Sequence, residues 1–246
     1  MKAMVLCAGY GTRLGELTRE VPKPMLTLHD RPVLAHILAQ LRAHGFDEIA
    51  VNLHFMPDAI RGHFGDGKKF GVKLTYAHEP TLLGTAGGVK NVETFLRGGA
   101  PFLVHYGDVI TDQDFTAVLR FHRERDALVT MLVHQRSRSN SVVALDAQQR
   151  VTGFLERPDD AARSLLESPW VNSGICICNA EVLDSIPAGQ PGDLPRDVFP
   201  RLIPSRRVFG FALTGYRCAI DSPQRLEEAR AALAEGRCRM APAAAG

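Results

Sequence analysis

Short apolar runs and helix-like segments alternate through the first 134 residues of the chain. The apolar runs lie at residues 2–7, 48–53, 72–79, 101–109 and 127–134, and the segments with helical spacing lie at 31–45, 56–65, 84–96 and 112–125. Apolar runs without alternation are typical of strands that are buried on both faces. The order β-α-β-α-β-α-β-α-β therefore predicts a parallel, doubly wound sheet that binds any ligand at the carboxyl ends of its strands.

The second half of the chain follows a different plan. Residues 140–158 indicate a hairpin with its turn at 146–149, residues 170–180 a strand, and residues 208–221 a strand pair broken at Gly215. A helix follows, with Ser222 as its N-cap and Pro223 as its first residue. We therefore predict an α/β fold with a Rossmann-like, mixed but mainly parallel sheet flanked by helices. One domain would cover residues 1–235, and the Ala- and Pro-rich residues 236–246 would form a flexible tail.

Net charge and cysteine content argue against a nucleic-acid-binding, membrane or zinc-binding protein. The 246 residues carry a formal net charge of +2, too small to indicate a nucleic-acid or membrane partner. The five cysteines are an odd number and lack zinc-site spacing, so they are predicted to be buried core thiols. The start of the chain resembles neither a signal peptide nor a membrane span. These features predict a cytoplasmic protein, for which a homo-oligomer is possible.

The loop after the first strand, "GYGTRLGELTREVPKPM" at residues 9–25, is the most informative segment. Leu14 stands where the dinucleotide fingerprint and the P-loop each need a glycine, so both patterns fail. Gly9 and Gly11 would let backbone N–H groups approach a polyphosphate, and Arg13 adds a planar donor. Pro22 and Pro24 restrict the backbone around Lys23. The loop is predicted to be a mobile phosphate clamp.

Two aspartates are predicted to lie at strand ends. Asp108 follows Gly107 at the end of the fourth predicted strand, and Asp221 ends a late one. Distant carboxylates can converge at this edge of an open α/β sheet. Their hard oxygens suit Mg²⁺, which usually binds substrate phosphates through one or two carboxylates.

Taken together, these segments resemble the sugar-1-phosphate nucleotidylyltransferases, also called nucleoside-diphosphate-sugar pyrophosphorylases. The resemblance rests on the opening loop and on "HEPTLLGTAGG", "HYGDV", "GFLERP", "VNSGICI" and "AIDSPQRLEEA", and covers nearly all of residues 1–235. It implies a glycosyltransferase-A-like fold with a nucleotide-binding half at 1–134 and a sugar-phosphate-binding half at 135–235. The chain is closest in look to the mannose-1-phosphate guanylyltransferases, without the C-terminal β-helix of many longer relatives.

The resemblance also assigns roles to individual residues. The catalytic group would be Arg13, Lys23, Asp108 and Asp221, with the two aspartates holding Mg²⁺. Nucleotide contacts would come from Ala8, Gly9, Gly11, Thr12, Arg13, Glu79, Gly84 and Thr85, and sugar-phosphate contacts from Gly107, Glu156, Arg157 and Asn172. The chain departs from the family pattern at Glu16, Ser141 and Arg157, where the family usually has proline, glycine and lysine.

The implied reaction is nucleotidyl transfer from an NTP to a sugar-1-phosphate, which gives an NDP-sugar for polysaccharide biosynthesis and pyrophosphate. The acceptor-only carboxylate of Glu79 favours guanine, which presents two adjacent donors, so GTP is the expected nucleotide. Mannose-1-phosphate is the sugar-phosphate that the resemblance favours. A heptose-1-phosphate guanylyltransferase, an enzyme that uses UTP or dTTP, and a non-catalytic nucleotide-sugar sensor stay open as alternatives.

Overall fold

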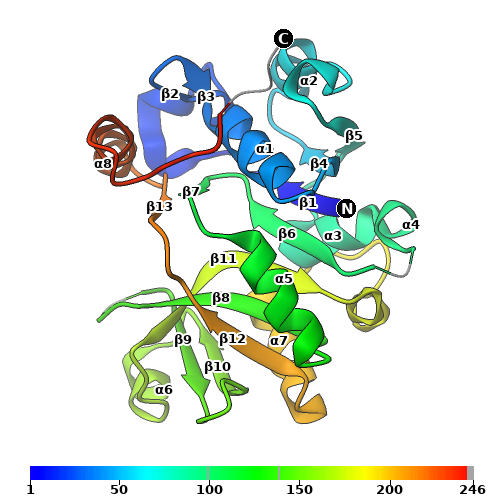
Figure 1. The fold of residues 1–246 in the computed structure, drawn as a ribbon, viewed down its shortest axis with the longest axis vertical. Helices are drawn as coiled ribbons and strands as arrows, with labels where there is room; N and C mark the ends of the chain where they lie inside the picture. Colours follow the sequence, from blue (N-terminus) through cyan, green and yellow to red (C-terminus); the bar gives the residue numbers. More distant parts are fainter. Residues whose placement is uncertain (99, 138, 243–246) are drawn as a thin grey trace. The chain divides into compact units, whose positions relative to one another are not determined.

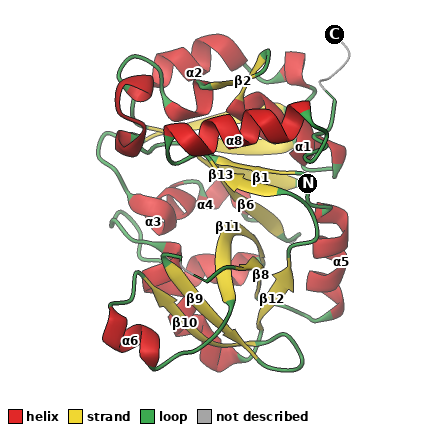
Figure 2. Ribbon diagram, turned by 90° about the vertical axis from the view of Figure 1, so that its left-hand side faces the viewer, coloured by secondary structure: helices red, strands yellow, loops and turns green. Residues whose placement is uncertain are grey.

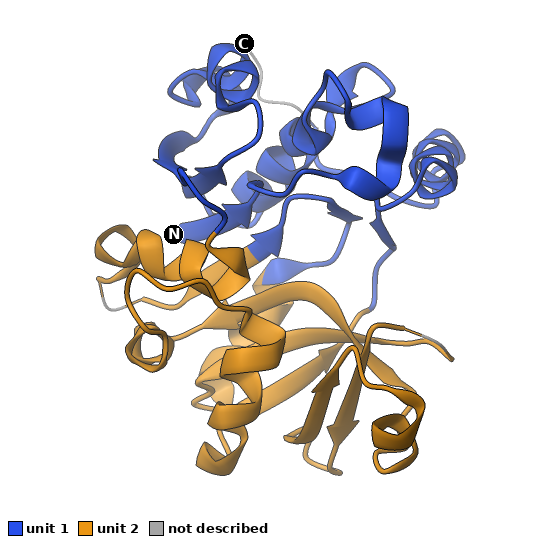
Figure 3. Ribbon diagram, turned by 180° about the vertical axis from the view of Figure 1, so that it is seen from behind, with its two compact units in different colours: residues 1–82, 105–115, 214–246 blue, residues 83–104, 116–213 orange. Residues whose placement is uncertain are grey.

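The structure, a computed structural model, describes residues 1–98, 100–137 and 139–242. The chain divides into two compact units (Figure 3). Unit 1 consists of residues 1–82, 105–115 and 214–246, and unit 2 of residues 83–104 and 116–213. This division follows packing, and the predicted functional halves at 1–134 and 135–235 stay a prediction.

Unit 1 is built around three parallel strands, β1, β4 and β5, which pair in that order. Strands β1 and β4 are mostly apolar and buried, as expected for strands covered on both faces, whereas β5 is more polar and partly exposed. Its elements are β1 (Lys2–Leu6), β2 (Thr27–Leu28), β3 (Arg31–Pro32), α1 (Val33–Ala43), β4 (Glu48–Leu53), α2 (Pro57–Phe64), β5 (Lys73–His78), β7 (Val109–Thr111), β13 (Arg217–Ala219) and α8 (Pro223–Ala234). Helix α8 packs beside β13 and β2, as Figure 2 shows.

Unit 2 contains a mixed sheet. Strand β11 pairs antiparallel with β8 and β9, β9 pairs antiparallel with β10, and β8 pairs in parallel with β12. Figure 1 labels the elements: α3 (Gly84–Asn91), α4 (Glu93–Leu96), β6 (Phe102–Tyr106), α5 (Phe115–Glu124), β8 (Val129–Gln135), β9 (Ser141–Leu145), β10 (Val151–Glu156), α6 (Asp160–Ser164), β11 (Trp170–Cys178), α7 (Phe199–Leu202) and β12 (Val208–Ala212). Strand β6 and helix α5 run across the boundaries between the segments of the two units.

Most predicted elements are confirmed, with three corrections. The predicted helix at 84–96 is interrupted at Val92, whose N–H donates to Val89 O in a tight turn. The fourth strand ends at Tyr106, so Gly107 and Asp108 form the turn into β7. The strands on either side of Gly215 pair with β8 and β7 rather than with each other.

The last part of unit 1 is held by hydrogen bonds. Arg239 N–H donates to Asp112 Oδ2 at 2.8 Å, and Ala241 N–H donates to Gln40 Oε1 at 3.2 Å. Cys238 is buried. The described residues of the predicted flexible tail are thus anchored, and residues 243–246 lie outside the described part of the chain. In the described ranges, no helix combines the length and apolar character that a membrane crossing requires.

Candidate active site

The opening loop of unit 1 forms a short 3₁₀ segment at Thr12–Thr18. Gly11 and Gly15 adopt φ angles of 71° and 56°, which favour glycine. The hydroxyl of Thr18 donates to the carbonyls of both glycines, at 3.0 and 3.3 Å, and Leu14 is only 2% exposed. Buried Leu14 and Thr18 therefore shape the loop, while Arg13 stays on its exposed side.

Lys23 contacts the first of the two predicted metal ligands. Pro22 and Pro24 are both buried on either side of it. The Lys23 Nζ lies 2.6 Å from Asp108 Oδ2, and the two side chains are 13% and 23% exposed. The two buried prolines restrict the backbone on either side of Lys23, and their role in directing it to a phosphate stays a prediction.

Arg13 contacts the second aspartate. Its NH1 lies 3.0 Å from Asp221 Oδ2, with side-chain exposures of 63% and 34%. The structure therefore brings together the four residues that the sequence predicts as catalytic, in two ion pairs within unit 1.

Strand pairing explains why Asp108 and Asp221 lie close together although they are far apart in sequence. Strands β7 and β13 pair antiparallel, with Val109 opposite Ala219. The next residue continues the ladder, since Ile220 N–H donates to Asp108 O at 2.7 Å. Each aspartate therefore stands beside the end of this short ribbon.

Buried neutral groups surround Asp108. Burial lowers the pKa of His105 to about 4, and it raises the pKa of the Cys7 thiol, with a further contribution from Asp108. Both side chains are therefore uncharged near neutral pH, and Lys23 supplies the countercharge. Gly107 is required by packing here, since an added Cβ would lie 2.6 Å from Cys7 Sγ and 2.7 Å from Leu6 O.

The carboxylates of Asp108 and Asp221 fit a divalent cation. Their oxygens are hard ligands, and a cationic side chain already lies within 3.0 Å of each. Among the described residues, no group of three or more His, Cys, Asp or Glu side chains could hold a metal. Two carboxylates with phosphate oxygens and water are the ligand set that Mg²⁺ commonly takes.

The remaining predicted nucleotide contacts in unit 1 differ in accessibility. Ala8 is buried, whereas Gly9 and Thr12 are exposed, and an added Cβ at Gly9 would meet nothing within 4 Å. The backbone around Gly9 is therefore open to a ligand, and its nucleotide contact stays a prediction.

Glu79 is fully buried in a polar network. Its Oε1 accepts a hydrogen bond from Asn52 Nδ2 at 2.8 Å, and Asn52 Oδ1 accepts from Cys7 N–H at 2.7 Å. His54 Nδ1 lies 2.7 Å from Glu79 O, and Tyr10 OH lies 2.7 Å from His54 Nε2. This network links the opening loop to the ends of β1, β4 and β5.

Sequence reasoning missed Asn52 and Tyr10 as members of this network. The signal was present for Asn52, since a polar side chain near the end of the apolar run "EIAVNL" must find partners when it is buried. Base recognition by Glu79 stays a prediction, and any such contact requires the side chain to become accessible.

Gly84 and Thr85, at the start of α3 in unit 2, pack against residues 190–194. Ala86 N–H donates to Gly192 O at 2.9 Å, and the Thr85 hydroxyl accepts from Leu194 N–H at 2.7 Å. An added Cβ at Gly84 would lie 2.4 Å from Gly192 O, and the φ of Gly84 is +70°. Close packing against residues 190–194 therefore explains why position 84 is a glycine and why position 85 carries a hydroxyl. The contact of both residues with nucleotide stays a prediction.

Glu156 ends strand β10 of unit 2, and Arg157 follows it. Burial raises the pKa of Glu156 to about 7, and the nearby Asp193 adds to the rise against the opposing effects of Arg157 and Arg196. Arg157 is a non-glycine residue at a φ of 50°, and its side chain is 79% exposed. Its Nε lies 3.8 Å from Glu156 Oε1, within ion-pair range but too far for a hydrogen bond.

Asn172 sits at a bulge in β11. Its Oδ1 accepts from Gly174 N–H at 3.2 Å, and its own N–H donates to Ser141 Oγ at 2.9 Å. Ser141, one of the departures from the family pattern, is thus a buried partner of Asn172. The sequence alone could not show this link, because it depends on the register between two strands.

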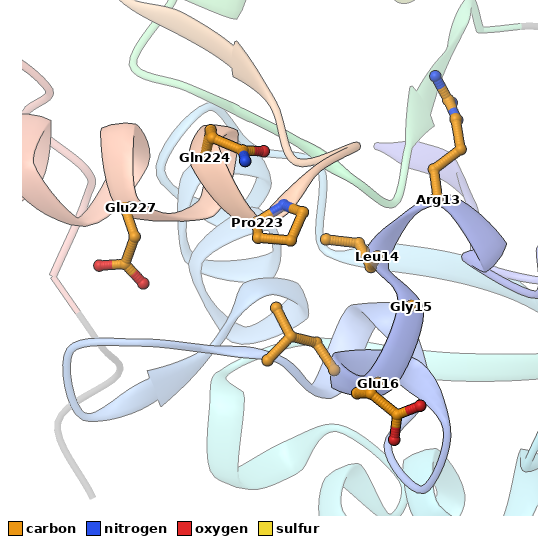
Figure 4. A pocket seen from close by; sticks show the side chains of 8 residues that line it. Arg13, Leu14, Gly15, Glu16, Pro223, Gln224 and Glu227 are labelled. Carbon is orange, nitrogen blue, oxygen red and sulfur yellow. The ribbon is translucent and has the colours of Figure 1, made fainter.

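A cavity of about 670 Å³ in unit 1 lies between the opening loop and the start of α8 (Figure 4). Its lining combines Leu14 and Pro223 with two carboxylates, Glu16 and Glu227, and one guanidinium, Arg13. Figure 4 shows the Arg13 side chain extending away from Pro223 and Leu14. The acidic lining does not suit a polyphosphate, so we do not assign the nucleotide to this cavity.

Comparison with known proteins decides the family. The profile described as Nucleotidyl transferase matches residues 2–215. The chain belongs to the nucleotidyl transferase family. This confirms the resemblance that the opening loop and the strand-end aspartates suggested.

Two curated relatives show the range within the family. A UTP–glucose-1-phosphate uridylyltransferase of Synechocystis sp. is 38% identical over 223 residues, which are 85% of this chain and 57% of that protein. A mannose-1-phosphate guanylyltransferase of Mycobacterium tuberculosis is 32% identical over 238 residues, 95% of this chain and 65% of that protein. The chain thus spans less than two thirds of the length of these relatives.

Solved structures confirm the predicted fold class, a mixed, mainly parallel sheet flanked by helices. A UDP-glucose pyrophosphorylase complexed with UDP-glucose superposes with a TM-score of 0.82 at 16% identity, covering 96% of this chain and 98% of the other. HddC from Yersinia pseudotuberculosis gives a TM-score of 0.78 at 20% identity, covering 94% and 99%. At these identities the likeness concerns the fold alone.

Proposed function

We propose that the protein transfers a nucleotidyl group from an NTP to a sugar-1-phosphate, giving an NDP-sugar and pyrophosphate for nucleotide-sugar biosynthesis. The observation that carries this proposal is the cluster of Arg13, Lys23, Asp108 and Asp221 in unit 1. GTP and mannose-1-phosphate are the proposed substrates, supported by the guanylyltransferase relatives.

The proposed reaction needs neutralisation of phosphate charge and does not need a general base. A sugar-1-phosphate is already anionic near neutral pH, and the barrier lies in bringing two anions together for in-line attack at the α-phosphorus. In this proposal Lys23 binds the attacking and α-phosphates, and Arg13 binds the departing pyrophosphate. Asp108 and Asp221 would hold Mg²⁺, which when bound neutralises phosphate charge.

Binding of the sugar-phosphate is assigned to unit 2. Arg157 offers an exposed guanidinium for phosphate, and Glu156 is an acceptor for sugar hydroxyls when ionised and a donor when protonated. Asn172 is held by the Gly174 and Ser141 contacts at a fixed place on β11. Gly107, in unit 1, is the remaining proposed contact, and its backbone beside Asp108 would face the phosphate.

The proposed guanine preference predicts the behaviour of Glu79→Gln. An amide replaces one acceptor oxygen with a donor, so the preference for GTP over UTP should shrink by about tenfold in a competition assay. The control is Glu93→Gln, because Glu93 forms surface ion pairs with Lys90 and Arg97. A wild-type enzyme that prefers UTP would refute the guanine assignment.

One alternative has specific support. The uridylyltransferase relative from Synechocystis is 38% identical, a higher value than that of the guanylyltransferase relative described above. UTP with glucose-1-phosphate is therefore the second substrate pair.

A substrate panel tests the proposal. The protein is incubated with Mg²⁺, each of five NTPs and a set of sugar-1-phosphates, and pyrophosphate release is measured. We expect release that requires both substrates, with the highest rate for GTP and mannose-1-phosphate. Absence of release with every pair would overturn the proposed activity and favour a nucleotide-sugar sensor.

A further inference from the structure

The four predicted catalytic residues of unit 1 form two ion pairs. Each pair joins a cation with a predicted phosphate role to a carboxylate with a predicted metal role. Each cation assigned to phosphate, Lys23 and Arg13, bonds one carboxylate assigned to the metal, Asp108 and Asp221 respectively. Both partners in each pair therefore belong to the proposed reaction, and each ion pair competes with substrate or metal for the groups that form it.

The two pairs differ in strength. The Lys23–Asp108 contact, at 2.6 Å, is largely shielded from water, whereas Arg13 in the other pair is 63% exposed. Exposed ion pairs contribute little because water and salt screen them, and shielded pairs are screened less. Lys23 should therefore resist separation from its carboxylate more than Arg13 does.

The backbone around each cation suggests how the pairs open. Arg13 lies between Gly11 and Gly15, both at positive φ, in the loop that buried Leu14 and Thr18 anchor. Lys23 lies between two buried prolines, so its backbone is fixed and only its side chain can swing.

We propose that Arg13 and Lys23 act as internal countercations that exchange partners when substrate binds. In the free protein they neutralise Asp221 and Asp108. In the complex they move to phosphate oxygens, and the two carboxylates become available to the divalent cation. This inference rests on the proposed function, since it takes the metal and phosphate roles from there.

The exchange couples metal binding to phosphate binding. A metal ion alone must displace or lie beside two cationic groups, so it binds weakly. A polyphosphate alone must compete with two carboxylates for the same cations. When both arrive together each supplies the partner that the other displaces, which is positive coupling between the two ligands. The protein thereby avoids binding either ligand unproductively.

Calorimetry with Mn²⁺ alone tests the first half of this claim. Lys23→Met removes the shielded countercation and should tighten Mn²⁺ binding about tenfold, and Arg13→Gln should tighten it less, by about threefold. Lys23→Arg keeps the charge and should bind Mn²⁺ as the wild type does. Arg19→Gln is the matched control, because Arg19 loses the same charge from the same loop but pairs with Glu16 at 3.1 Å.

Titration with inorganic tripolyphosphate in the presence of EDTA tests the second half. Asp108→Asn releases Lys23 and should tighten tripolyphosphate binding about tenfold. Asp66→Asn is the control, since Asp66 pairs with Lys68 at the surface of the same unit. Circular dichroism verifies that each variant is folded, and if Lys23→Met is not, Arg13→Gln and Asp108→Asn carry the test.

The outcomes separate this inference from the proposed function. Equal Mn²⁺ affinity in the wild type, Lys23→Met and Arg13→Gln, or no Mn²⁺ binding in any of them, overturns the exchange of partners, whatever the pyrophosphate assay shows. Tighter Mn²⁺ and tripolyphosphate binding in the variants supports the exchange, and absence of pyrophosphate release by the wild type with every substrate pair would at the same time refute the proposed reaction.

Discussion

The charged clusters of unit 1 and unit 2 are balanced in opposite ways. In unit 1 each carboxylate of the proposed metal site bonds a cation, so the cluster is close to neutral. In unit 2 Glu156 is half-buried and lies near Asp193, and its pKa rises to about 7. The comparison teaches that each carboxylate of the unit 1 cluster has a bonded cation beside it, whereas in unit 2 burial and Asp193 outweigh the effects of Arg157 and Arg196 and favour the protonated form of Glu156.

The largest expected effect comes from the aspartates of unit 1. Asp108→Asn and Asp221→Asn should each lower turnover by about 10²–10³-fold, because each removes a charged oxygen from the proposed metal site. Pyrophosphate release under saturating substrate measures the effect, with Asp66→Asn as the control. Near wild-type turnover in both variants would show that the unit 1 cluster is a structural ion-pair group only.

The next effect separates the two cations of the same cluster. Lys23→Met should lower kcat by about 10²-fold with a smaller change in nucleotide affinity, because its contacts are expected to strengthen in the transition state. Arg13→Gln should lower kcat less, by about tenfold, and weaken nucleotide binding. Steady-state kinetics combined with equilibrium binding of the nucleotide distinguishes the two, and equal effects of both variants on both quantities would remove the division of roles.

A substitution at Gly84 tests how tightly this predicted nucleotide contact of unit 2 packs against residues 190–194. Gly84→Ala places a Cβ 2.4 Å from Gly192 O at a φ of +70°. It should lower the free energy of unfolding by at least about 2 kcal/mol, because it adds both steric overlap and backbone strain.

Urea denaturation measures this loss. Gly62→Ala is the matched control, since Gly62 lies in α2 and an added Cβ there meets nothing within 4 Å, so it should be neutral or stabilising by up to about 1 kcal/mol. A Gly84→Ala variant as stable as Gly62→Ala would show that the packing against Gly192 is loose.

The last effect depends on pH and concerns the proton of Glu156. The folded pKa, about 7, lies above the ordinary value of 4.5, so the folded state binds more protons between these limits. The contribution of Glu156 to stability is therefore present in full below pH 4.5 and is lost as the pH rises to about 7. Glu156→Gln lacks this dependence, and the difference in unfolding free energy between wild type and variant should fall over that interval. A constant difference would show that Glu156 has an ordinary pKa.

The sequence predicts most of the regular framework because its signals are local. The apolar run "EIAVNL" and the helical spacing from Val33 to Leu41 correspond to β4 and α1. Short irregular turns at 180–205 have no such period, and three of them, including η5 (Leu194–Val198), were not predicted. Val182, Leu194 and Phe199 are buried, and their packing fixes this segment although its sequence shows no helical or strand period.

The candidate site was predictable where it depends on residue type and not where it depends on register. Position after a strand and within a proline-flanked loop singles out Asp108 and Lys23 as candidates, and their roles, which the resemblance implies, stay predictions. The contact of Ser141 with Asn172, and the enclosure of Glu79 by Asn52, depend on how distant strands align. Pairing of the four charged residues of unit 1 likewise depends on the register of β7 with β13.

One measurement tests the central claim, that the unit 1 cluster directs nucleotidyl transfer at the α-phosphorus. Phosphorus NMR follows GTP, mannose-1-phosphate and Mg²⁺ with the wild type and with the Asp108→Asn/Asp221→Asn double variant. The account predicts that the wild type forms a nucleotide-sugar and pyrophosphate in equal amounts, and that the double variant forms neither over the same time. Formation of orthophosphate in place of pyrophosphate, or equal product from the double variant, would contradict it.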